Sequence, residues 1–213
     1  MKIIKIEATV EDEAPPPPKK KWSWENITKV SGVIIGIAGL WYTALQYRAS
    51  EKWKRAEFVV KEVKEFESDE RVKLIEQALD YTDTKHYPFK KDTIDIDRGK
   101  MNKSLDTAGE VFTGTVDILR NSFDGYFDHL SIFDRYVKSD VMNFEEIKPY
   151  LEYYIDIIGD TANPRLSMQS RKLIWSYLNN YHFTDVQELF CLFDYNIVPG
   201  ASSCSKRKFL GIL

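Results

Sequence analysis

The sequence predicts a mainly all-α protein, with one N-terminal transmembrane helix that continues into a stalk and then a helical bundle domain. Two observations predict this class. An apolar run covers residues 27–47, and apolar residues recur at helical spacing through most of the chain that follows. The predicted parts are a flexible tail with four consecutive prolines over 1–26, the transmembrane helix over 27–47, the stalk over 48–67, the helical domain over 68–198 and a disordered tail over 199–213.

The run ITKVSGVIIGIAGLWYTALQY carries a single charge, Lys29, near its start. At about 1.5 Å per residue it is roughly 30 Å long, which matches the hydrocarbon core of a bilayer. A single-pass span is therefore predicted, with the lipid bilayer as its surroundings. Residues suited to the membrane interface flank the run, and we take them as anchors: Trp22, Trp24, Trp41, Tyr42, Tyr47 and Arg48. The alternative is a buried core helix of a soluble domain.

Small residues recur along one side of the predicted span, at intervals of three and four positions. Such a stripe lets two helix backbones approach closely in lipid, where close packing replaces the hydrophobic drive. We therefore predict self-association, or pairing with another membrane helix, through Thr28, Gly32, Gly36, Gly39 and Thr43.

Positive charge predicts the orientation of the span. Four basic residues follow it within eight positions, whereas three lysines precede it behind an acidic tail. Because cytoplasmic flanks carry the excess of Lys and Arg, the C-terminal domain is predicted to be cytoplasmic.

The first helical segments follow directly. No proline or glycine interrupts 48–66, where Trp53, Ala56, Val60 and Val63 predict an apolar face. Ser68 is predicted to cap the next helix, whose buried face consists of Val72, Ile75, Ala78 and Leu79. Residues 80–103, with Pro88 and Gly99, are the least helical part. We predict a surface excursion there, which a short hairpin around 86–97 would fit.

Further helices are predicted from Ser122 onward. A central core helix carries an aromatic stripe at helical spacing: Phe123, Tyr126, Phe127, Leu130, Phe133, Tyr136 and Val137. After a turn capped by Asn143, a helix is predicted to begin at Pro149 and to end at Gly159. It carries Tyr150, Leu151, Tyr154, Ile155 and Ile158. Another covers 167–181, and Thr184 with Gln187 predicts a capping box for the last one.

Chemical motifs do not point to an enzyme. The sequence has no P-loop, GxSxG or HExxH motif, and the Asp92–Gly99 segment lacks the spacing of a calcium loop. Asp124, Asp128 and His129 share a helix face, but no second Glu-x-x-His pair faces them as a di-metal site would need. A net charge of −3 without a basic face argues against nucleic-acid binding. We therefore predict no catalytic, cofactor-binding or metal-binding residue.

The segments WKRAEFVVKEVKEFESDERVKLIEQALDY, EEIKPYLEYYIDIIGD and YLNNYHFTDVQELF give the chain a resemblance to a group of bacterial membrane-anchored proteins with no established activity. The resemblance covers roughly residues 27–195. It implies an N-terminal span, a charged stalk, a helical domain and a location in the bacterial inner membrane, but no activity.

The first functional hypothesis is a single-pass membrane protein whose cytoplasmic helical domain binds another protein, as a tether, scaffold or regulator. The second is a membrane-acting effector of a bacterial stress or phage-defence system, assembled through the glycine stripe. The third is an enzyme that uses the carboxylates of Asp124 and Asp128 with His129.

Overall fold

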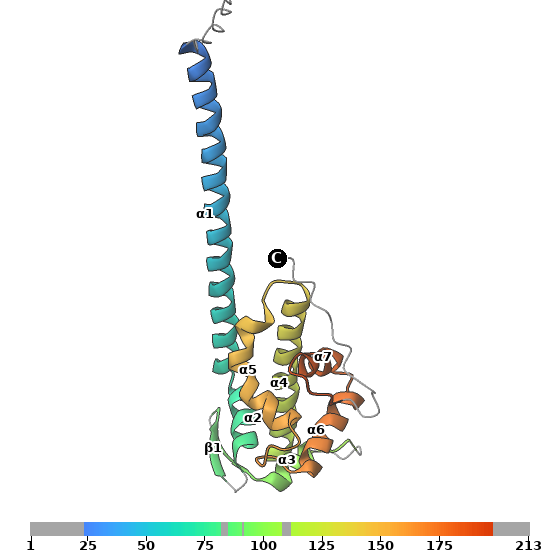
Figure 1. Ribbon diagram of the computed structural model, residues 1–213. Coiled ribbons are helices and arrows are strands. Elements are labelled where there is room, and N and C mark those ends of the chain that lie inside the picture. The colour runs from blue at the N-terminus through green and yellow to red at the C-terminus, as the bar shows by residue number, and fades with distance from the viewer. Residues whose placement is uncertain (1–23, 82–84, 91, 108–111, 198–213) are drawn as a thin grey trace, which may run out of the picture. The chain divides into compact units, whose positions relative to one another are not determined.

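The computed structural model describes residues 24–81, 85–90, 92–107 and 112–197 (Figure 1). Contacts divide the chain into two units, Met1–Ser50 and Glu51–Leu213. The predicted tail over 1–26, apart from its last three residues, lies outside the described residues. The whole of the predicted tail over 199–213 does so as well.

The all-α prediction is confirmed, since the described residues form seven helices and one two-stranded sheet. The elements are α1 Trp24–Ser68, α2 Glu70–Asp80, β1 Lys85–Phe89, β2 Asp92–Ile96, α3 Arg98–Ser104, α4 Thr115–Lys138, α5 Phe144–Gly159, α6 Met168–Asn180 and α7 Thr184–Leu192.

Helix α4 is the centre of the second unit, because α2, α3 and α7 all pack against it (Figure 1). Its predicted aromatic stripe is confirmed: Phe123, Tyr126, Phe127, Leu130, Phe133 and Val137 are buried, and Tyr136 is half-buried. Each large side chain so buried contributes about 1.5–3 kcal/mol of hydrophobic stabilisation. The helix begins at Thr115, earlier than the predicted Ser122, because Leu119 adds a buried position one turn before the first aromatic residue.

The last turns of α1 belong to the same core. Val59, Val63 and Phe66 are buried, whereas Trp53 and Val60 are exposed, so the predicted apolar face is rotated by about one residue. The N-cap of α2 is Asp69, whose carboxylate accepts from the backbone N–H of Arg71 at 2.8 Å. The prediction of Ser68 as this cap is wrong, because its hydroxyl donates back to the carbonyl of Glu65 instead.

The hairpin around 86–97 is present as the antiparallel pair β1 and β2, in which Tyr87 is the register partner of Ile94. Alternation puts four side chains into the core: Tyr87, Phe89, Ile94 and Ile96. Helix α3 follows at once, in a stretch where Gly99 favours a break in helical structure. Its formation is explained by the N-cap Asp97, which accepts from the backbone N–H of Lys100, and by burial of Met101.

Helix α5 is continuous, so the prediction of a separate turn before a helix starting at Pro149 is wrong. A capping box between Asn143 and Glu146 starts the helix at Phe144, and Pro149 lies inside it. Pro149 is the sixth residue of α5, so its missing N–H removes the helical hydrogen bond to the carbonyl of Glu145. Burial of Ile147, Leu151 and Ile155 on the same helix offsets this loss. Its end at Gly159 is confirmed.

The two C-terminal helices agree with prediction in position. Ser167 caps α6 by accepting from the backbone N–H of Ser170 at 3.1 Å. Helix α7 begins at Thr184, but its N-cap is Phe183 and no side chain caps it, so the predicted capping box with Gln187 is wrong.

Candidate functional site

The first half of α1 is the most apolar exposed part of the described chain. Between Ser31 and Tyr47 it carries no charged residue, and nine large side chains there are 49 to 74% exposed: Val33, Ile34, Ile35, Ile37, Leu40, Trp41, Tyr42, Leu45 and Tyr47. They point in all directions around the helix, because consecutive residues of an α-helix differ by about 100°. A shallow apolar hollow on this surface is lined by Ile34, Ile37, Ala38, Trp41, Tyr42 and Leu45.

The predicted transmembrane span is not confirmed. Among the described residues, no helix combines the length and the apolar character needed to cross a membrane. The predicted anchor Trp22 lies outside the described residues. The same holds for the side chains of Trp24, Ile27, Thr28 and Val30.

The three glycines among the predicted packing residues of α1 have open space beside them. A β-carbon placed on Gly32, Gly36 or Gly39 would meet nothing within 4 Å. Thr43 donates its hydroxyl to the carbonyl of Gly39 at 2.8 Å, one turn back in the same helix. This bond satisfies the hydroxyl within its own helix.

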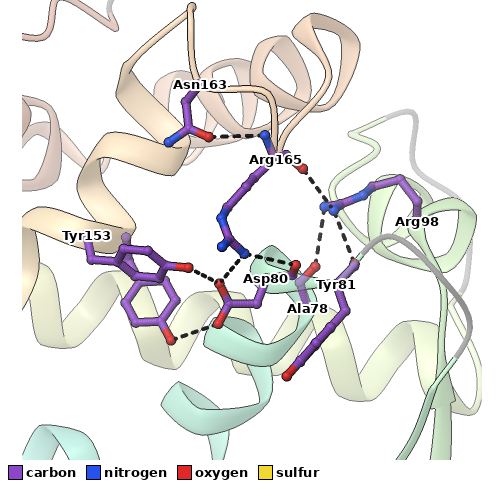
Figure 2. Close-up of polar contacts among 8 residues, drawn as sticks. Ala78, Asp80, Tyr81, Arg98, Tyr153, Asn163 and Arg165 are labelled. Atoms are coloured by element: carbon purple, nitrogen blue, oxygen red, sulfur yellow. Dashed lines mark hydrogen bonds and ion pairs between the residues drawn. The ribbon is translucent and has the colours of Figure 1, made fainter.

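In the second unit, a polar site lies where α2 ends against α5 (Figure 2). The carboxylate of Asp80 accepts hydrogen bonds from the hydroxyl of Tyr153 at 2.6 Å and from that of Tyr154 at 3.2 Å. Arg165, from the segment between α5 and α6, is 3.3 Å from the same carboxylate. Three elements distant in sequence are therefore joined at one side chain, which we call the Asp80 junction, made of Asp80, Tyr153, Tyr154 and Arg165.

Arg98 of α3 completes the surroundings of the junction. Its guanidinium donates to the carbonyls of Ala78 at 3.3 Å, Tyr81 at 3.1 Å and Arg165 at 3.3 Å (Figure 2). A cation at the C-terminal end of α2 satisfies carbonyls that have no helical partner and is favoured by the helix dipole. The position of Arg98 therefore ties α3 to the junction.

Tyrosines beside the junction form an exposed aromatic surface. Tyr81, Tyr150 and Tyr153, which we call the tyrosine face, are each 45 to 46% exposed. Tyr150 and Tyr153 are three residues apart on α5 and so are neighbours on its surface. Two cations lie over these rings: Lys85 Nζ is 3.0 Å from the ring centre of Tyr81, and the Arg165 guanidinium is 5.5 Å from that of Tyr153. Tyr154, on the same helix, is half-buried.

Glu76 lies one turn before Asp80 on α2 and is half-buried. Burial raises its pKa to about 7, and the nearby carboxylates of Glu67 and Asp80 act in the same direction. The charge of Glu76 in turn raises the pKa of the Tyr126 and Tyr154 hydroxyls, on top of the larger effect of their burial. The charge of this side chain therefore changes near neutral pH.

The carboxylates considered for an enzymatic site have separate roles. Asp124 accepts from the Tyr177 hydroxyl at 2.5 Å, and His129 Nε2 lies 3.1 Å from the carboxylate of Asp69, while Asp128 is exposed. Within the described ranges, no three His, Cys, Asp or Glu side chains are grouped as a metal site.

No protein-family model matches the chain, and comparison with curated proteins and with solved structures found no match either. The resemblance to bacterial membrane-anchored proteins therefore stays a prediction, and functional arguments depend on the geometry of the chain itself.

No local sequence pattern indicates the Asp80 junction, since the carboxylate and its tyrosine partners are more than 70 positions apart. One signal was available for the tyrosine face. Tyr150 and Tyr153 are adjacent on a helical wheel but lie beside, rather than within, the stripe of Leu151, Ile155 and Ile158 that is buried.

Proposed function

We propose that the chain is a membrane-tethered protein-interaction module. In this proposal the apolar part of α1, beginning in the predicted span at Ile27 and ending at Tyr47, holds the protein in the bilayer. The helical domain binds a protein partner on the cytoplasmic side, as a tether, scaffold or regulator.

One observation carries the tether: nine large apolar side chains of α1 are exposed around its whole circumference. Burying side chains of this size is worth about 1.5–3 kcal/mol each, so water is an unfavourable environment for this stretch. A protein partner bound to one side of α1 would leave the apolar side chains on its other sides exposed to water, whereas lipid covers all sides of the helix. The internal hydrogen bond of Thr43 removes a polar group that lipid could not satisfy.

The tether is tested by expressing the full chain with a C-terminal tag in a bacterial host. Membranes are extracted with alkaline carbonate, and spheroplasts are treated with protease. The proposal expects the chain to stay in the membrane fraction and the tag to be protected from protease. Release by carbonate contradicts the tether, and digestion of the tag contradicts the cytoplasmic orientation.

The tyrosine face supports the interaction role. Tyrosine and arginine are the residues most enriched at the energetic centres of protein interfaces, because they offer large contact area together with hydrogen-bonding groups. Here Tyr153 and Arg165 are held rigidly by the Asp80 carboxylate, so little entropy is lost when a partner contacts them.

Crosslinking in native membranes tests this surface. The proposal expects a partner in a fixed ratio to the chain, lost in Tyr150→Ala and retained in Met168→Ala, a matched change at an exposed apolar residue of α6. Truncating a central tyrosine should weaken binding by about tenfold or more. If no partner appears in a fixed ratio, or if both variants retain it equally, the tyrosine face is not the binding surface.

The tether also offers a surface for self-association, because no side chain occupies the space over Gly32 and Gly36. In lipid, such open backbone favours close helix pairing. Gly32→Leu with Gly36→Leu should then abolish a dimer seen by crosslinking in membranes, whereas Ile35→Leu should leave it intact. A dimer that persists in the glycine variant contradicts pairing along this stripe.

A further inference from the structure

Four consecutive residues of α1, at positions 52–55, comprise three cationic side chains and one exposed tryptophan. Lys52, Trp53 and Lys54 are exposed, Trp53 to 73%, and Arg55 is half-buried. Glu51 is the single acid between Arg48 and Arg55, so the local charge is strongly positive. We call the four residues 52–55 the basic collar.

The geometry of a helix distributes the collar around its axis. Successive residues differ by about 100°, so the four side chains point in four directions that together surround the helix. A protein partner would contact one side of a helix and would leave most of the collar unused. A layer of lipid headgroups surrounds a helix completely, and its negative charge complements the three cations.

The distance of the collar from the apolar stretch also suits contact with lipid headgroups. Lys52 follows Tyr47, the last residue of the apolar stretch, by five positions in the same helix. At about 1.5 Å per residue this separation is roughly 7 Å, close to the thickness of one headgroup layer. Tryptophan prefers this layer, because its ring is apolar and its N–H needs a polar neighbour.

We propose that the basic collar binds anionic phospholipid headgroups, which then gather around α1 where it leaves the bilayer. This inference rests on the proposed membrane tether. Its basis is the attraction of clustered Lys and Arg side chains beside a membrane helix to anionic lipid. An acidic protein segment is the competing ligand, and it is favoured if the experiment below, which contains lipid alone, shows no preference for anionic lipid.

The test uses the full chain in vesicles of phosphatidylcholine with one-fifth phosphatidylglycerol. Bromine on the acyl chains quenches tryptophan at short range, and it is placed either on the anionic lipid or on an equal amount of the neutral lipid. The contribution of Trp53 is the difference between the unmodified chain and Trp53→Phe. If anionic lipid gathers at the collar, brominated phosphatidylglycerol should quench Trp53 at least twofold more strongly than the neutral lipid.

The decisive variant is Lys52→Gln with Lys54→Gln, and its matched control is Lys61→Gln with Lys64→Gln, an equal loss of exposed charge farther along α1. The first variant should lose most of the preference for anionic lipid, and the control should keep it. All four lysines are exposed, so neither variant removes a core contact, and circular dichroism in the vesicles checks that both remain helical.

The outcomes separate the inference from the tether. If the chain enters the vesicles but quenching is equal for both lipids, the collar does not bind anionic headgroups and the tether stands. If the preference is the same in both double variants, its source lies elsewhere and the inference is wrong. If the chain does not enter vesicles at all, the tether and the inference both fail.

Discussion

The ring of Tyr195 lies directly against Gly159, the last residue of α5. A β-carbon on Gly159 would be 2.5 Å from two ring atoms of Tyr195 and 2.9 Å from its Cβ, distances that real side chains do not tolerate. The Tyr195 hydroxyl donates to the carboxylate of Asp156 at 2.9 Å, nearly one turn earlier in the same helix. The segment after α7 is therefore fastened over the end of α5, and glycine at position 159 makes this possible.

Gly159→Ala should accordingly destabilise the protein by about 1–3 kcal/mol, because the added methyl group forces the ring or the helix end to move. Chemical denaturation measures this loss. In Gly159→Ala combined with Tyr195→Ala, both contacts with the ring are removed and the 2.9 Å approach of the β-carbon at position 195 remains, so the double variant should lose clearly less than the sum of the single losses. Strictly additive losses would contradict a direct contact between these residues.

Where one face of an element is buried, the sequence predicted the fold well. The stripe on α4 and the buried face of α2 follow from periodicity. The end of α5 at Gly159 was also predicted, but Gly159 has no positive φ, and its missing side chain instead makes room for the ring of Tyr195. Helix α3 could not be predicted in this way. It has two turns and contains Gly99, and it forms because Asp97 caps it and the core buries Met101.

The candidate site was less predictable, because its contacts join distant segments. The Asp80 junction depends on the way α2 and α5 pack, and local sequence around Asp80 does not encode that arrangement. The N-cap predicted for α2 was wrong for a related reason. Ser68 and Asp69 are both acceptable N-cap residues, and the choice of Asp69 is stabilised by Arg71 and by His129 from α4.

Arg171 offers a test of how the core tolerates a cation. It is 1% exposed, its Nε donates to the carbonyl of Ile157 at 3.2 Å, and its Nη2 donates to the carbonyl of Asn163 at 2.5 Å. Burial lowers the pKa of this guanidinium. Its partners are carbonyls at and after the C-terminal end of α5, where a cation is favoured.

Arg171→Ala should cost about 2–5 kcal/mol, because it creates a cavity and leaves two carbonyls without their donor. Arg171→Lys should recover less than half of that loss, since one ammonium lacks the planar fork that reaches both carbonyls. Lys172→Ala is the matched control on the exposed side of α6 and should change the free energy of unfolding by no more than about 0.5 kcal/mol. Full recovery by lysine would show that charge alone matters.

Asp69 combines a helix cap with an ion pair, and the two roles can be separated. The Arg71 guanidinium, 2.7 Å from its carboxylate, holds the pKa of Asp69 well below its usual range, and the backbone N–H of Arg71 and His129 add to this effect. A lowered pKa in the folded state stabilises the protein at pH values above about 4, and this contribution is lost as the pH falls below that value.

Asp69→Asn keeps the capping oxygen and removes the charge, so it should lose about 1 kcal/mol at pH 7 and flatten the dependence of stability on pH below about 5. Asp69→Ala removes both the capping oxygen and the charge, so it should be roughly 1 kcal/mol less stable than Asp69→Asn. Denaturation curves between pH 3 and pH 7 measure both effects. If asparagine and alanine are equally destabilising, the cap contributes nothing beyond the charge.

Glu76 should have the opposite pH dependence. Because its pKa is raised to about 7 in the folded state, the unfolded chain loses its proton first as the pH rises from about 4.5. The contribution of Glu76 to stability is therefore largest below about pH 4.5 and decreases as the pH rises to about 7. Above about pH 7 it is constant. Glu76→Gln removes the titration and should make the protein about 1–3 kcal/mol more stable than the unmodified chain at pH 8, but not at pH 4.5.

Thermal or chemical unfolding at matched ionic strength gives the difference at each pH, and Glu70→Gln, an exposed acid on the same helix, is the control that should show no such trend. A stability difference that is independent of pH would mean that Glu76 is ionised throughout this range. In that case its neighbours would have to supply compensating charge, and Lys73, which favours the ionised form, would be the first candidate.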